Sequence, residues 1–180
     1  MLREIVRGDW VHTLDITLKA HYGAAEGIAI YKMYSHTFSS AYQERFDAEA
    51  AVLDIVHIES LKNKANVALN LYKEKSGELR FKLYHPGSPL PLSDILPVLE
   101  NFGLKVIDEI PYRLSVGNSE HLVWMHDFGL AVRSGVFVDI AVVKPLFEHA
   151  LHSVLKGEME NDGFNKLIIA AGLDWHQIFL

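Results

Sequence analysis

The sequence predicts an α+β domain in which helices cover an antiparallel sheet. The clearest indication is the stretch from Leu79 to Leu114, which reads as strand, glycine turn, helix and strand. Phe81 and Leu83 alternate with polar residues at the period of two that is typical of a half-buried strand, and Gly87 permits a turn. One helix face then carries apolar residues at the i, i+3, i+4, i+7 spacing: Leu92, Ile95, Leu96, Leu99 and Phe102. Gly103 suits the end of that helix, and a second strand begins at Lys105.

The amino-terminal segment predicts a β-hairpin. Apolar and polar residues alternate from Trp10 to Lys19 and again from Ile28 to Tyr34, with Gly23 and Gly27 in the turn between them. This hairpin either extends the sheet or is the remnant of a preceding repeat.

Two helices and a strand are predicted between this hairpin and Leu79. Ser39 or Ser40 suits the N-cap of a short helix over residues 42–46, and Asp47 suits the N-cap of a longer one from Ala48 to Leu61. An alternating strand follows over residues 67–72, and Gly77 lies in the hairpin that leads into the strand at Leu79.

The carboxyl-terminal third predicts one more strand and then helices. His121 to Leu130 reads as the strand, residues 136–142 suit either a strand or a helix, and Pro145 suits the first turn of a helix. A last helix is predicted over residues 164–171. We therefore divide the chain into a domain over residues 1–135, which includes the extra amino-terminal hairpin, and a helical extension over residues 136–180 that leads toward a next domain.

The order of elements from Leu79 onward resembles the first half of an ACT-type regulatory domain, a ferredoxin-like βαββαβ module that often binds amino acids. The large bacterial NAD-specific glutamate dehydrogenases have an ACT-like region upstream of their catalytic domain. This chain resembles that region in RFKLYHPGSPLPLSDILPVLENFGLKVIDEIPYRL (residues 80–114) and VWMHDFGL (123–130). FSSAY (38–42) and DIVHIE (54–59) fit the same region, so the resemblance covers roughly residues 10–130.

The order also implies a circular permutation of that module. The helix at residues 48–61 and the strand at residues 67–72 would supply the module's last helix and strand ahead of its first. The fourth and first strands are antiparallel neighbours in that sheet, so a short hairpin can join them.

Composition limits the possible functions. The 180 residues are 49% hydrophobic and 22% charged, with a formal net charge of −6 and no run of basic residues, which argues against a nucleic-acid partner. The chain has no cysteine, which excludes disulfides and thiolate chemistry. It has no apolar run of the ~20 residues that a membrane helix needs and no signal-like amino terminus, so we expect no membrane partner and a cytoplasmic location.

The sequence also lacks the motifs of an autonomous enzyme. Neither G-x-G-x-x-G nor G-x-x-x-x-G-K-[ST] occurs, and no G-x-S-x-G is present, so we predict no catalytic residue and no cofactor site in this chain. His126 and Asp127 are neighbours on a predicted strand and therefore face opposite ways, which argues against a catalytic dyad. His149 and His152 share a helix face, but no third metal ligand is placed by the sequence, so no metal site is assigned.

The loop after residue 84 is the predicted functional site. In ACT-like modules this loop exposes backbone N–H groups beside a helix start, and such groups suit a carboxylate. The resemblance thus implies an amino-acid effector at His85, Gly87, Ser88 and Ser93. The alternative is that Gly87 only satisfies the turn.

These observations lead to three hypotheses. The first is a non-catalytic regulatory and assembly segment of an NAD-dependent glutamate dehydrogenase, whose parent oxidises L-glutamate to 2-oxoglutarate and ammonium with NAD. Its expected partners are the rest of the parent chain, an amino-acid effector and further copies in a homo-oligomer. The second is a free-standing amino-acid-binding ACT-like module, and the third is a small metal-dependent enzyme built on the histidines.

Overall fold

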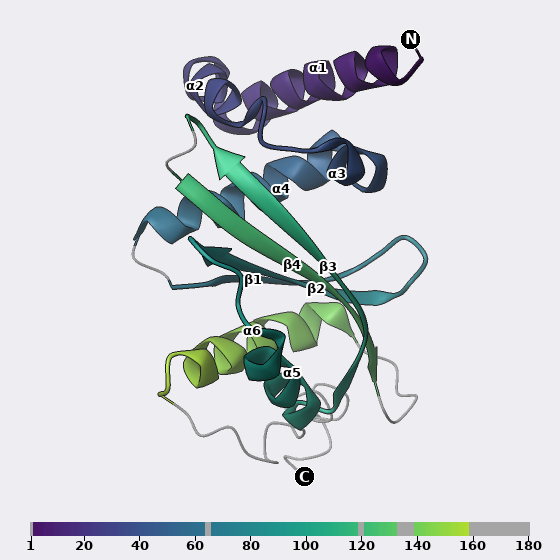
Figure 1. The fold of residues 1–180 in the computed structure, drawn as a ribbon, viewed down its shortest axis with the longest axis vertical. Coiled ribbons are helices and arrows are strands. Elements are labelled where there is room, and N and C mark those ends of the chain that lie inside the picture. Colours follow the sequence, from purple (N-terminus) through teal and green to yellow (C-terminus); the bar gives the residue numbers. More distant parts are fainter. Residues whose placement is uncertain (1, 64–65, 119–120, 133–138, 159–180) are drawn as a thin grey trace. The chain divides into compact units, whose positions relative to one another are not determined.

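The computed structural model describes residues 2–63, 66–118, 121–132 and 139–158 (Figure 1). The described elements, in chain order, are α1 (Leu2–Tyr22), α2 (Ala24–Tyr34), α3 (Ser40–Arg45), α4 (Ala48–Ser60), the 3₁₀ turn η1 (Leu61–Asn63), β1 (Ala68–Lys73), β2 (Leu79–Pro86), α5 (Leu92–Asn101), β3 (Leu104–Val116), β4 (His121–Val132) and α6 (Ile140–Leu155). The strand, turn, helix and strand expected from Leu79 to Leu114 are confirmed. The helix predicted over residues 164–171 lies outside the described residues.

The four strands form one antiparallel sheet in the order β1-β2-β4-β3. A ferredoxin-like sheet has the order 4-1-3-2, and this sheet has that order when β2 is counted as its first strand and β1 as its fourth. The α+β class and the permuted place of the strand before Leu79 are therefore confirmed.

The chain divides into two compact units, and each of the four strands has residues in both of them. The first comprises Met1–Ala68, Tyr84–Ser88 and Tyr112–Trp124, and the second comprises Leu69–Leu83, Pro89–Pro111 and the chain from Met125 onward. Helices α1 to α4 belong to the first unit, and α5 and α6 belong to the second.

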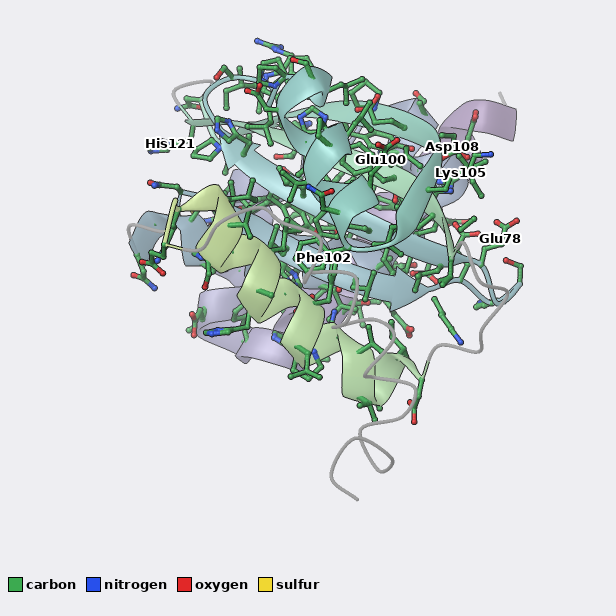
Figure 2. The ribbon with its side chains drawn as sticks, turned by 90° about the horizontal axis from the view of Figure 1, so that it is seen from below. Glu78, Glu100, Phe102, Lys105, Asp108 and His121 are labelled. Carbon is green, nitrogen blue, oxygen red and sulfur yellow. The ribbon has the colours of Figure 1, made fainter. Side chains whose placement is uncertain are left out.

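The core of the second unit is a group of four phenylalanines. The Phe147 ring on α6 lies 5.4 Å from Phe81 on β2 and 5.2 Å from Phe102 on α5, between ring centroids, and Phe81 stacks on Phe128 of β4 at 6.0 Å. Figure 2 labels Phe102 at the end of α5. These contacts make α6 the second helix of the ferredoxin-like module. The prediction that the helix at residues 48–61 takes this place is wrong, because α4 belongs to the first unit.

The face of β2 opposite Phe81 is buried as well. Arg80 and Lys82 are each 3% exposed, and Tyr84 is fully buried, although the alternation predicted a half-buried strand. Lys82 Nζ lies 5.2 Å from the centroid of the Tyr72 ring, and the partners of Arg80 and Tyr84 are described below.

The predicted amino-terminal hairpin is wrong, because residues 2–34 form two helices. Leu14 and Leu18 are fully buried, whereas Ile16 between them is 54% exposed. Apolar residues four apart lie on one helix face, so Trp10, Leu14 and Leu18 satisfy a helix as well as a strand. Gly23 alone joins the helices, with a positive φ of 86°.

Gly27 is a helix-packing residue and not a turn residue. A Cβ at this position would lie 2.6 Å from the Lys19 Cα and 2.9 Å from its backbone nitrogen. The backbones of α1 and α2 therefore approach each other too closely for any side chain.

Gly27→Ala is expected to lower the free energy of unfolding by about 1–3 kcal/mol, because backbone atoms cannot move aside as a flexible side chain would. Gly8→Ala is the matched control, since Gly8 is exposed on α1 and its Cβ would meet no atom within 4 Å. That change is expected to stabilise the chain by about 0.5–1 kcal/mol through helix propensity. Urea unfolding of both variants measures the difference, and equal effects of the same sign would contradict close packing at Gly27.

Side chains of α6 cover part of the free edge of β1. Glu148 Oε1 accepts a hydrogen bond from the Leu71 N–H at 3.0 Å, and Lys144 Nζ donates to the Leu71 carbonyl at 2.7 Å. Lys144 and Glu148 also form an ion pair at 2.9 Å. An edge strand with unpaired backbone groups is a template for pairing with another chain, and this pair occupies both groups of one residue.

The helix caps expected at Ser39 and Asp47 are confirmed. The Ser39 side chain accepts from the Tyr42 N–H, and the Asp47 side chain accepts from the Ala50 N–H. Among the helices of the described residues, none has the length and apolar character needed to cross a membrane.

Candidate functional site

The loop between β2 and α5 turns at Gly87, which has a positive φ of 84°. The Gly87 N–H donates to the Leu122 carbonyl at 2.7 Å, and the Ser88 N–H donates to the Pro86 carbonyl at 3.1 Å. His85 Nδ1 lies 2.5 Å from the Ser88 carbonyl oxygen, so this nitrogen carries the proton. These backbone N–H groups already have acceptors, and Gly87 itself remains exposed.

The same loop is held at its far side by a histidine of the second unit. His126 Nε2 accepts from the Leu90 N–H at 3.1 Å, and His126 Nδ1 lies 2.9 Å from Glu109 Oε1. This arrangement requires a neutral imidazole with its proton on Nδ1. Ser93 is exposed in the first turn of α5. The four predicted effector residues thus lie along one loop and the helix after it, and their role stays a prediction.

A pocket of about 600 Å³ opens in the first unit beside Gly87, and we call it the Lys62 pocket. Its walls are mostly apolar, and polar side chains reach it from α2, η1 and the start of β4. The lining residues are Tyr34, Ile58, Leu61, Lys62, Pro86, Gly87, Val116, His121, Leu122 and Val123. They come from five separate segments of the chain, so no local motif indicates the pocket.

Glu59 lies next to this pocket and has partners at both oxygens. Its Oε1 accepts from the Tyr34 hydroxyl at 2.5 Å, and its Oε2 accepts from Lys62 Nζ at 2.7 Å. Burial of Tyr34, followed by its hydrogen bond to Glu59, raises the pKa of the phenol well above its ordinary value. The Tyr34 hydroxyl therefore stays protonated and donates to Glu59.

A second polar group in the first unit is a buried carboxylate on α4. Asp54 is fully buried, and it accepts short hydrogen bonds from the hydroxyls of Tyr42 on α3 and Tyr84 on β2. Burial and then the Asp54 charge raise the pKa of Tyr42 well above its ordinary value. The His57 ring stacks on Tyr84 at 5.2 Å between centroids. This Asp54 cluster joins three elements, and sequence reasoning missed it because its members are far apart in the chain.

A buried arginine organises the polar face of the second unit. Arg80 Nε donates to Asp127 Oδ1 at 3.1 Å, and its Nη2 donates to Asp108 Oδ1 at 2.9 Å. Burial alone would lower the pKa of Arg80, but the hydrogen bonds to Asp108 and Asp127 raise it above its ordinary value. Figure 2 labels Asp108 beside Lys105 on β3.

Two neighbours complete this Arg80 cluster. The Tyr72 hydroxyl donates to Asp127 Oδ1 at 3.1 Å, and burial followed by the Asp127 charge raises the pKa of Tyr72. A Cβ on Gly129 would lie 2.8 Å from Asp108 Oδ1 and 2.9 Å from an Arg80 nitrogen. Asp127 thus binds Arg80 and Tyr72, whereas His126 binds Glu109, so the two adjacent residues have separate partners as predicted.

Comparison with known proteins places these features in a family. A family model described as the ACT3 domain of glutamate dehydrogenase matches residues 66–143, and one described as helical motif 2 of glutamate dehydrogenase matches residues 17–61. Together they cover more than half of the chain. The NAD-specific glutamate dehydrogenase of Halomonas elongata is 37% identical over 160 residues, which are 87% of this chain and 10% of that protein. This chain belongs to the NAD-specific glutamate dehydrogenase family.

Two other relatives carry the same description. The NAD-specific glutamate dehydrogenase of Pseudomonas aeruginosa is 37% identical over 161 residues, which are 88% of this chain and 10% of that protein. That of Mycobacterium tuberculosis is 28% identical over 153 residues, which are 82% of this chain and 9% of that protein. The chain thus spans about a tenth of the length of these relatives.

The matched ranges agree with the elements of the chain. The helical motif 2 match covers the end of α1 together with α2, α3 and α4, which is a second reason why the predicted amino-terminal hairpin is wrong. The ACT3 match begins before β1 and ends within α6, so it includes all four strands and α5. The ACT3 match runs to residue 143, and the predicted division at residue 135 stays a prediction.

His149 and His152 lie on α6, and Glu148 beside them does not serve as a third metal ligand. The Glu148 carboxylate binds the Leu71 N–H and Lys144, as described above. In the part of the chain that the structure describes, no group of three or more His, Cys, Asp or Glu side chains is placed to hold a metal ion.

Proposed function

We propose that this chain is a regulatory and assembly segment of an NAD-dependent glutamate dehydrogenase, whose parent oxidises L-glutamate to 2-oxoglutarate and ammonium. The observation that carries the proposal is the succession of helical motif 2 and ACT3 within a chain that spans about a tenth of its NAD-specific relatives. NAD and the catalytic groups then belong to the rest of the parent chain, which is the main partner of this segment.

The buried ionisable groups support a structural role for this segment. Asp54 accepts hydrogen bonds from two tyrosines, and Asp127 accepts hydrogen bonds from Arg80 and Tyr72. Groups held between buried partners stabilise a scaffold, whereas an acid or base of a reaction must reach a substrate.

The effector part of the proposal concerns His85, Gly87, Ser88 and Ser93. An amino acid bound along this loop would shift the parent enzyme between two states, and its effect is limited to its difference in affinity for them. Gly87 is the suitable position for a test, because a Cβ there would meet no atom within 4 Å and the strain comes from its positive φ alone.

The test is a panel of the nineteen amino acids other than L-glutamate, the proposed substrate, added to the parent enzyme, with Gly87→Val compared with the unchanged sequence. We expect at least one amino acid to change the rate of glutamate oxidation, and Gly87→Val to abolish that response. Gly77→Val is the matched control, since Gly77 has a similar φ of 88° and equally open surroundings in the β1–β2 hairpin. An equal loss of response in both variants would contradict an effector site at this loop.

A further inference from the structure

We propose that the Lys62 pocket binds a small monocarboxylate with an apolar body and no ammonium group. The pocket lies entirely within the first unit, between the end of α4, the turn η1 and the strand ends at Gly87 and His121. Its volume of about 600 Å³ falls in the range of roughly 300–1,000 Å³ that is usual for small-molecule sites.

The apolar walls select the body of the ligand. Ile58, Leu61, Val116 and Leu122 supply aliphatic surface from a helix, a turn and two strands. Burying a branched aliphatic group against them removes apolar surface from water, which is the main source of affinity in pockets of this kind.

The ionisable lining groups select the charge of the ligand. Lys62 and His121 line the pocket, and no carboxylate does so among the described residues. The Lys62 side chain is 49% exposed and uses one of its three donors on Glu59, so further donors can bind a carboxylate at the mouth. His121 is exposed at the start of β4, where Figure 2 labels it, and adds a second donor.

The same groups select against an ammonium group. Glu59 is the carboxylate nearest to this site along α4, and both its oxygens already accept hydrogen bonds from Tyr34 and Lys62. An α-amino acid would therefore place its ammonium group against apolar walls or beside the cationic Lys62 that pairs with Glu59, and both cost free energy. The ligand class inferred for the Lys62 pocket thus differs from the amino-acid effector proposed for the loop.

Calorimetric titration of the purified chain with 4-methylpentanoate and with L-leucine tests this inference, because the two probes share a carboxylate and a branched aliphatic body. We expect 4-methylpentanoate to bind with a submillimolar to millimolar Kd and L-leucine to bind at least about tenfold more weakly. No heat from 4-methylpentanoate at millimolar concentration, or tighter binding of L-leucine, would overturn the proposal.

Two variants locate the binding. Lys62→Gln is expected to weaken 4-methylpentanoate binding about three- to tenfold, in keeping with a half-exposed charge. Lys105→Gln is the matched control, since Lys105 is exposed on β3 in the second unit. Leu61→Trp should block the cavity, and a circular dichroism spectrum shows whether this variant folds.

Amide shifts at Leu122 and Val123 on adding 4-methylpentanoate provide a readout that does not depend on any variant, and their absence would contradict the site. The parent enzyme's response to amino acids plays no part in these measurements, so this inference and the proposed function can fail separately.

Discussion

Asp54→Ala is expected to lower the free energy of unfolding by about 3–5 kcal/mol, which is a large share of the total stability of an ordinary domain. The change removes the common acceptor of Tyr42 and Tyr84, both fully buried, and leaves two hydroxyls without it in a dry environment. It also leaves space where the carboxylate was. Urea unfolding followed by circular dichroism measures the loss.

Asp94→Ala is the matched control for this prediction. Asp94 is exposed in the first turn of α5, where a carboxylate contributes about 0.3–1 kcal/mol through the helix dipole. A double-mutant cycle separates the hydrogen bonds from the space. Tyr42→Phe in the Asp54→Ala background should cost less than Tyr42→Phe alone, because the hydroxyl has already lost its acceptor. Independent, additive losses would show that the Asp54 cluster does not act as a unit.

The sequence predicted the part of this fold that local patterns determine. From Leu79 to Leu114, the strand period, the helix face and the turn glycine all indicate the same elements, and the structure has them. Residues 10–34 were predicted wrongly because Trp10, Leu14 and Leu18 fit both an alternating strand and a helix face. The close packing of α1 against α2 at Gly27 is a tertiary contact, which the local pattern of residues does not contain.

The sequence predicted only the part of the candidate site that neighbouring residues determine, which is the turn between β2 and α5. The turn at Gly87 follows from its residue type and the prolines around it. The Lys62 pocket does not, because Lys62, Gly87 and His121 meet only after the strands have paired. Asp54 is 12 residues from Tyr42 and 30 from Tyr84, so no local pattern relates these residues, and the sequence analysis assigned Asp54 no role.

Arg80→Met is expected to cost about 3–5 kcal/mol of unfolding free energy, because it removes the guanidinium group that donates a hydrogen bond to the fully buried Asp127. Methionine retains much of the length and apolar stem of arginine, so packing contributes little to the loss. Arg113→Met is the matched control, since Arg113 is exposed on β3, and it should change stability by no more than about 0.5 kcal/mol.

Two further variants distinguish the charge from the geometry of the Arg80 cluster. Arg80→Lys keeps the charge but cannot reach Asp127 and Asp108 with the two separate nitrogens that arginine uses, so an intermediate loss is expected. Arg80→Met combined with Asp127→Leu removes both charges and should recover stability relative to Arg80→Met alone. A double variant that is less stable than Arg80→Met alone would contradict this expectation. It would mean that Tyr72 and the other neighbours of Asp127 stabilise its carboxylate without Arg80, and that Arg80 contributes to stability mainly through its hydrogen bond to Asp108.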